Sequence, residues 1–200
     1  MTNRELVLFV KSKLGTAYVY GMKGDVLTLQ KYEQLKLLFG RLIRESDKGK
    51  IGQVCVDCSG LISWGTGIHR NSQGYHDTAE VVFPVDTIEQ AHVGAAVWCK
   101  GHIGIYIGDG KYIAADGSAY GVREAKVKGS SFTHWFLLKD IEYEKEAPAK
   151  EILLYNGKEY QVEMIRRDGV TYLKTRDIAK VLGLSVDSRG KIPVLADRCH

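Results

Sequence analysis

Cys58 has the residue type and the surroundings that nucleophilic catalysis by a thiol requires. It follows a loop and opens an apolar segment with helical spacing, and Asp57 before it is a typical helix N-cap. A thiol at a helix N-terminus lies close to unpaired N–H groups and to the positive end of the helix dipole, which both favour the thiolate. The charge of Asp57 opposes this effect, so the direction of the net pKa change stays open. A small buried core residue is the alternative interpretation of Cys58.

A thiolate nucleophile needs a base within hydrogen-bond reach, and His102 is the candidate. It begins a predicted strand over 102–108, where His102, Gly104 and Tyr106 share one face and the isoleucines share the other. Gly104 is expected to leave space beside the imidazole. A surface histidine at a strand end is the alternative. The other histidines have no neighbours that indicate a role: His69, His76, His92, His134 and His200.

The imidazole of a catalytic histidine is usually oriented by a third group, and Asp116 is the candidate. If the hairpin loop has three residues (108–110), Asp116 lies directly across from His102 on the same face. A two-residue loop, Asp109-Gly110, would turn Asp116 to the opposite face. The orienting role of Asp116 therefore depends on the loop, and a solvated carboxylate is the alternative.

Helical patterns come first in the chain. Apolar spacing predicts a helix over 3–14 with Asn3 as N-cap, and a second helix from after Thr28 to about Arg44. Residues 15–24 and 46–54 are expected to be loops, and 69–92 has no firm periodicity. The buried face of the second helix is expected to carry Leu35, Leu38, Phe39 and Leu42.

From residue 93 the apolar period changes to two, which predicts strands. Five are expected, over 93–100, 102–108, 111–116, 120–127 and 135–143. Helices followed by an antiparallel meander favour an α+β fold, with one sheet and helices packed on a face.

Composition indicates an ordinary globular protein, because 44% of the 200 residues are hydrophobic and 26% are charged. The net charge of +4 is too small to imply a nucleic-acid partner. No apolar run is long enough to span a bilayer, so no membrane insertion is expected. The four cysteines are too few for a disulfide scaffold. The C-V-D-C at 55–58 is a weak zinc or redox motif because no second CxxC or paired His lies at ligand spacing, so we expect no metal and no cofactor.

The charged segment 144–150, which contains Pro148, is expected to link a domain over 1–143 to a small domain over 151–200. The small domain is expected to turn at Asn156-Gly157 and at Asp168-Gly169, to form a short helix near 176–182, and to end in a loop. About 50 residues is near the lower limit for independent folding, so this domain is expected to lean on the first domain or on a copy of itself.

With these residues placed, three motifs in the first domain resemble the NlpC/P60 family of cysteine peptidases. D-C-S-G-L-I at 57–62 is followed by G-H-I-G-I-Y-I-G-D-G at 101–110, and G-T-A-Y-V-Y-G at 15–21 is similar to the family's loop with a tyrosine near the nucleophile. Further segments look most like phage and prophage endolysins: K-G-D-V-L-T (23–28), A-D-G-S-A-Y-G-V (115–122) and W-F-L-L-K-D-I-E-Y (135–143). The resemblance covers residues 1–143.

The resemblance implies a papain-like core in which Cys58 is the nucleophile, His102 is the base and Tyr18 lines the site. Asp57 and Ser59 flank the nucleophile and are expected to contact polar groups of the substrate. The implied reaction is hydrolysis of peptidoglycan stem peptides, most often at the γ-D-glutamyl–diamino acid bond, through a thioacyl intermediate and without a metal.

One position departs from the family's pattern. The third catalytic position, twelve residues after the histidine, normally carries a polar side chain, and here it is Ala114. Asp116 substitutes for it, or a backbone carbonyl or water does, or activity is reduced. We expect catalysis, because removing an orienting residue usually costs much less than removing the nucleophile. The alternatives are a catalytically impaired wall-binding module and a related thiol amidase or transferase of the same fold.

The N-terminal residues lack the pattern of a signal peptide. We therefore expect a protein made in the cytoplasm that acts on the cell wall after holin-type release, as a phage endolysin does. Residues 151–200 resemble the stalk-type domain at the N-terminus of copper amine oxidases, which implies wall attachment or a homodimer through this domain. No copper chemistry is expected, because no histidine cluster is present.

Overall fold

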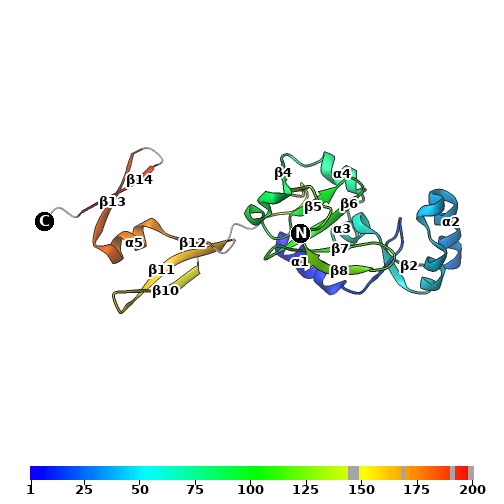
Figure 1. The fold of residues 1–200 in the computed structure, drawn as a ribbon, viewed down its shortest axis with the longest axis horizontal. Coiled ribbons are helices and arrows are strands. Elements are labelled where there is room, and N and C mark those ends of the chain that lie inside the picture. Colours follow the sequence, from blue (N-terminus) through cyan, green and yellow to red (C-terminus); the bar gives the residue numbers. More distant parts are fainter. Residues whose placement is uncertain (144–148, 168–169, 190–191, 198–200) are drawn as a thin grey trace. The chain divides into compact units, whose positions relative to one another are not determined.

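The computed structural model describes residues 1–143, 149–167, 170–189 and 192–197 (Figure 1). The chain divides into two compact units, Met1–Glu144 and Lys145–His200. The first unit combines helices with an antiparallel six-stranded sheet, which is the α+β fold expected from the sequence. Among the described residues, every helix falls short of the length and apolar character that a membrane span requires.

Helix α1 (Asn3–Ser12) starts one residue after its N-cap, which is Thr2 and not the predicted Asn3. Thr2 and Glu5 form a capping box, in which each side chain accepts a hydrogen bond from the other residue's backbone N–H. The start of α1 is also tied to the end of the first unit, because Asn3 N–H donates to the carbonyl of Glu142 (3.0 Å) and Glu142 N–H donates to that of Met1 (3.1 Å).

Helix α2 (Leu29–Phe39) begins after the N-cap Thr28, as predicted, but ends at Gly40. Two short 3₁₀ helices follow, η1 (Gly40–Leu42) and η2 (Glu45–Lys50). Of the four residues expected on the buried face only Leu35 is buried, because Leu38, Phe39 and Leu42 are 73%, 36% and 52% exposed. The buried face is narrower than predicted, since α2 contacts the core through little more than Tyr32 and Leu35.

A small three-stranded sheet lies next to this helix. It consists of β1 (Ala17–Tyr18), β2 (Lys23–Val26) and β3 (Val54–Val56), in the order β1-β3-β2. The prediction of loops over 15–24 and 46–54 was therefore wrong in part. The strands are two to four residues long and their partners are far away in the sequence, so no local alternation reveals them.

Helix α3 (Cys58–Thr66) follows β3 directly and has Asp57 as its N-cap, as predicted. It ends at Gly67, whose φ of 73° closes the helix in the left-handed conformation. Leu61 and Ile62 are buried in a cluster shared with α1 and the large sheet. The segment without periodicity contains a short helix and a strand, α4 (Ser72–Asp77) and β4 (Val82–Pro84), and a 3₁₀ helix, η3 (Val85–Gln90).

The large sheet has the strand order β4-β9-β5-β6-β7-β8. Its remaining strands are β5 (Ala96–Cys99), β6 (His102–Gly108), β7 (Lys111–Ala115), β8 (Val122–Lys126) and β9 (His134–Phe136). The first four of these form the predicted meander. The last strand does not continue it, because β9 returns to pair with β5, and this part of the prediction was wrong.

The hairpin between β6 and β7 combines the two loop geometries that the sequence left open. Asp109 and Gly110 have positive φ angles of 52° and 65°, as in a two-residue type I′ turn. A bulge at Ile107 adds one residue to β6 and cancels the change of register that the short turn alone would cause. Asp116 therefore lies on the same face as His102.

The second unit begins with a three-stranded sheet of β10 (Ala149–Tyr155), β11 (Lys158–Arg167) and β12 (Val170–Leu173). Its first turn is at Asn156-Gly157, as predicted, whereas Asp168-Gly169 lies outside the described residues. Helix α5 (Thr175–Leu182) confirms the short helix. The predicted final loop is wrong, because β13 (Leu184–Arg189) and β14 (Ile192–Asp197) pair as antiparallel strands there.

Candidate active site

Asp57 joins the start of α3 to the segment that follows Tyr18 in the chain. Its Oδ1 accepts hydrogen bonds from the Gly60 N–H (2.6 Å) and the Ser59 hydroxyl (3.1 Å), and its Oδ2 accepts one from the Gly21 N–H (2.8 Å). Asp57 and Ser59 are only 8% and 7% exposed. Their polar atoms are therefore engaged within the protein, where they hold the N-terminal turn of α3 in place.

The Cys58 side chain is 7% exposed at the N-terminus of α3. Burial, and after it the charge of Asp57, raise the pKa of the thiol to about 12, although hydrogen bonds from the backbone N–H groups of Ile103, Ser59 and Cys58 itself act in the opposite direction. Among the described residues, the partners of the sulfur are thus backbone groups and not the imidazole of His102. The sequence left open whether the pKa of Cys58 is raised or lowered. In the structure it is raised, so the Cys58 thiol is neutral in the resting protein.

Tyr18 lies in β1, opposite Val56 of the strand that leads into the nucleophile segment. Burial is the main cause that raises the pKa of its phenol, and the neighbouring Cys58 and Asp57 raise it further. The phenol therefore stays protonated at physiological pH. The phenol is near Cys58 and Asp57, and its role in lining the site stays a prediction.

His102 and Asp116 are brought together from the ends of two neighbouring strands. His102 is the first residue of β6, and Asp116 follows the last residue of β7. The distance between His102 Nε2 and Asp116 Oδ1 is 3.0 Å. On its other side the imidazole stacks on Phe132, with ring centroids 5.2 Å apart and planes inclined by 7°. These contacts fix both the plane and the position of the imidazole.

The second carboxylate oxygen of Asp116 is held by two residues that the sequence analysis missed. Tyr112 Oη donates to Oδ2 (3.1 Å), and Arg123 Nε donates to the same atom (2.6 Å). Burial by itself would raise the pKa of Asp116, but the hydrogen bonds from His102, Arg123 and Tyr112 outweigh it and hold the pKa below its usual value. Strand alternation places Tyr112 on the face of Asp116, so it was detectable once the register was known.

Ala114 is fully buried on this face of the sheet. A Cβ on Gly104 would lie 3.0 Å from the Cβ of Ala114 and 3.2 Å from the Tyr112 ring. The space that Gly104 was expected to leave beside the imidazole is therefore occupied from the neighbouring strand. The carboxylate nearest to His102 comes from position 116, two residues beyond the position that carries a polar group in the family's pattern.

Within the described residues, no three His, Cys, Asp or Glu side chains gather as metal ligands would. Cys55 and Cys58 are both free thiols. They lie in different apolar clusters, Cys55 with Val19 and Met22, and Cys58 with Leu61 and Ile103.

A helix that begins with a thiol and packs on an antiparallel sheet, with a histidine at the start of a facing strand, is the arrangement of a papain-like core. The sequence profile of the NlpC/P60 family matches residues 15–140. Because this is more than half of the chain, the protein belongs to the NlpC/P60 family. No curated protein matches the chain.

Several solved structures are similar at low sequence identity. The P60 domain of an antigen from Mycobacterium avium subspecies paratuberculosis is 24% identical, with a TM-score of 0.48, and the match covers 70% of this chain and 98% of that domain. The peptidoglycan hydrolase RipB from Mycobacterium tuberculosis is 24% identical over 70% of this chain and 67% of its own, with a TM-score of 0.45.

NlpC1 from Trichomonas vaginalis is 18% identical, with a TM-score of 0.47, and the match covers 68% of this chain. The chain spans less than half the length of NlpC1 and NlpC2 from this organism, at 43% and 46%.

Proposed function

We propose that the protein is a peptidoglycan hydrolase that cleaves stem peptides, with Cys58 as nucleophile and His102 as base. The observation that carries the proposal is the 3.0 Å hydrogen bond between His102 Nε2 and Asp116 Oδ1. Because an ionised carboxylate only accepts hydrogen bonds, Nε2 carries the proton, and Nδ1 of the neutral imidazole is free to accept one. Asp116 thereby sets the tautomer that a base requires.

Acylation follows from this arrangement. The Cys58 proton moves to His102 Nδ1 while the sulfur attacks the peptide carbonyl carbon, which forms a C–S bond and an oxyanion. Backbone N–H groups of Cys58 and Ser59, which point toward the sulfur in the resting enzyme, are the donors available to the oxyanion. Collapse breaks the C–N bond, and the proton on Nδ1 passes to the leaving amine.

Deacylation uses the same groups in reverse. A water molecule gives its proton to His102 Nδ1 as its oxygen attacks the thioester carbon. The C–S bond then breaks, the acid product leaves, and the sulfur takes the proton back. In this scheme Tyr18 lines the substrate's path to the thiol. Asp57 and Ser59 act mainly by shaping the helix start, and contact with the substrate would require them to exchange an internal hydrogen bond.

The finer points of the proposal concern the bond and the setting. We assign the γ-D-glutamyl–diamino acid bond as the target. We also assign the role of a phage endolysin that is made in the cytoplasm and reaches the wall after holin-type release. What supports these assignments is membership of the family, together with the endolysin-like segments 23–28, 115–122 and 135–143.

Mass spectrometry of purified peptidoglycan tests the activity and the bond together. The chain, its Cys58→Ala variant and a matched Cys99→Ala control would each be incubated with peptidoglycan. We expect new stem-peptide fragments from the wild type and from Cys99→Ala, and none from Cys58→Ala. The masses name the bond, and transfer products in place of hydrolysed ends would indicate the transferase alternative.

A catalytically impaired wall-binding module is the second candidate, and Ala114 is the observation that favours it. It predicts no fragments from any of the three proteins, while all of them sediment with cell walls. For the second unit we propose wall attachment or self-association. Comparing the full chain with residues 1–144 in wall sedimentation and in analytical ultracentrifugation separates these two roles.

A further inference from the structure

A buried ion pair lies outside the residues used so far. Asp47 and Lys50 both belong to η2, and Lys50 Nζ is 2.7 Å from Asp47 Oδ1. The side chain of Asp47 is 1% exposed and that of Lys50 is 16% exposed. Buried charges add little net stability even when they are paired, because the loss of hydration offsets their attraction. The pair therefore calls for an explanation other than stability.

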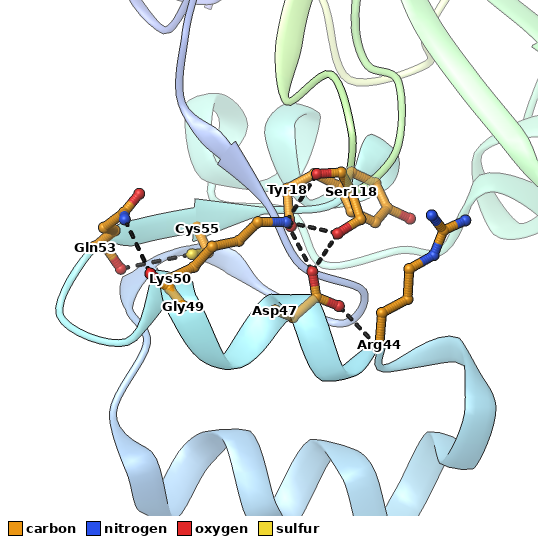
Figure 2. Close-up of polar contacts among 8 residues, drawn as sticks. All are labelled: Tyr18, Arg44, Asp47, Gly49, Lys50, Gln53, Cys55 and Ser118. Atoms are coloured by element: carbon orange, nitrogen blue, oxygen red, sulfur yellow. Dashed lines mark hydrogen bonds and ion pairs between the residues drawn. The ribbon is translucent and has the colours of Figure 1, made fainter.

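The ammonium group of Lys50 contacts two further segments (Figure 2). Nζ lies 2.6 Å from the carbonyl oxygen of Tyr18, and 2.9 Å and 2.6 Å from the carbonyl and hydroxyl oxygens of Ser118. The Ser118 hydroxyl also donates to Asp47, whose Oδ2 in turn accepts the N–H of Arg44 (2.9 Å). One cation thus joins η2, β1 and the turn that follows β7.

The two segments that Lys50 joins to η2 both contain or adjoin a residue of the candidate site. Tyr18 lies in β1 itself, and Ser118 lies two residues after Asp116, which binds His102. Ser118 belongs to a turn over residues 116–121. The Asp116 N–H closes this turn by donating to the carbonyl of Gly121 (2.9 Å). A displacement of Ser118 would therefore move the backbone of Asp116.

We propose that Lys50 is a positioning residue for the active site: its ammonium fixes the Ser118 turn against β1 and thereby holds the Asp116 carboxylate on His102. This inference deepens the proposed function and rests on it for the activity measurements alone. The aliphatic chain of a methionine would fill the same space, but it cannot bond the carbonyl groups of Tyr18 and Ser118. Those two segments would then lose this link, and the backbone hydrogen bonds of Val122 with Gly15 and Thr16 (2.8 Å each) would remain between them.

The variant Lys50→Met tests the proposal, with Lys48→Met as the matched control because Lys48 is exposed on the same 3₁₀ helix. We expect Lys50→Met to lower kcat about 10- to 100-fold, since small misplacements of catalytic groups have effects of this size. Lys48→Met is expected to keep wild-type kcat. Since Lys50→Met leaves Asp47 without its cation, the double variant Asp47→Asn/Lys50→Met provides a folded alternative if the single variant is unstable.

A spectroscopic readout separates positioning from stability and does not need the substrate. In ¹⁵N-histidine NMR we expect His102 of the wild type and of Lys48→Met to be the Nε2–H tautomer, and His102 of Lys50→Met to be a mixture of tautomers. The signal would be assigned by its absence from His102→Gln. A folded Lys50→Met protein with an unchanged His102 tautomer and unchanged kcat would overturn the proposal. If the wild type cleaves no peptidoglycan, the proposed function fails, and the tautomer still decides the role of Lys50.

Discussion

Gly60 in the first turn of α3 faces the backbone carbonyl of Met22 so closely that a Cβ on Gly60 would lie 2.1 Å from that oxygen. The same carbonyl accepts a hydrogen bond from the Asp57 N–H (2.9 Å). The turn that carries Cys58 is thus pressed directly onto the segment before β2. A glycine is needed at this position of the D-C-S-G motif because no side chain has room there.

Replacing Gly60 with alanine should push α3 away from this segment and destabilise the fold. We expect the free energy of unfolding to fall by about 1–3 kcal/mol, the usual cost of overpacking. Urea denaturation measures it, with Gly49→Ala as the control, because a Cβ on Gly49 would have no neighbour within 4 Å and its φ is not positive. Equal stability of the two variants would contradict the close approach.

The raised pKa of Cys58 has a kinetic consequence. Because the pKa is about 12, the thiolate fraction at neutral pH is small, so iodoacetamide should alkylate Cys58 slowly near pH 7 and faster as pH rises from 7 to 10.5. Cys99, which is less buried, should react faster at neutral pH. Peptide mass spectrometry follows the two sites separately, and fast alkylation of Cys58 that does not depend on pH would show a preformed thiolate instead.

The hydrogen bond between Asp116 and His102 predicts a loss of activity without loss of the fold. Asp116→Asn keeps the shape of the side chain but offers an amide that can donate to Nε2 and so favour the wrong tautomer. We expect kcat to fall about 10²- to 10⁴-fold, which is the effect of removing the carboxylate of a catalytic triad. Asp109→Asn, in the exposed turn of the same hairpin, is the control and should retain wild-type kcat in the peptidoglycan assay.

The lowered pKa values of Asp116 and Asp47 predict how stability depends on acid. Burial raises both values, but hydrogen bonds from His102 and Arg123 to Asp116, and from Lys50 and Ser118 to Asp47, outweigh it. The unfolded chain therefore takes up protons first as the pH falls. The stabilising contribution is fully present above pH 3.8, the unperturbed value, and is lost as the pH falls through the lower folded values.

Urea unfolding between pH 2.5 and 7 measures this dependence. The free energy of unfolding of the wild type should decline below about pH 4, and the decline should be shallower for Asp116→Asn, which lacks one of the two groups. Identical slopes for the two proteins would show that Asp116 titrates alike in the folded and unfolded chains.

Local patterns predicted the elements that carry the candidate site. Asp57 was identifiable as the N-cap of α3 from its residue type and from the apolar spacing that follows it. The alternation of His102, Gly104 and Tyr106 predicted β6. The partner of His102 depended on the hairpin loop, and sequence alone left two registers open. The bulge at Ile107 decides between them, and no residue type marks it.

Contacts between distant segments could not be predicted in the same way. Strand β9 pairs with β5 across almost forty residues of sequence, and nothing in its own alternation distinguishes this pairing from one with β8. Asp47 and Lys50 were assigned to a loop, because a short 3₁₀ helix has no apolar period. Their role depends on partners 32 and 68 residues away from Lys50, in Tyr18 and Ser118.

The pairing of the first residues with Glu142 bears on how the protein matures during translation. Helix α1 leaves the ribosome well before its partner, because the strand bridge at Thr2 and the hydrogen bond of Asn3 need Glu142, which is made some 140 residues later. In a chain whose synthesis stops before Glu142, helix α1 would lack this partner and would stay accessible to chaperones and proteases. The nascent chain can therefore complete its first unit only when the synthesis of that unit is almost finished.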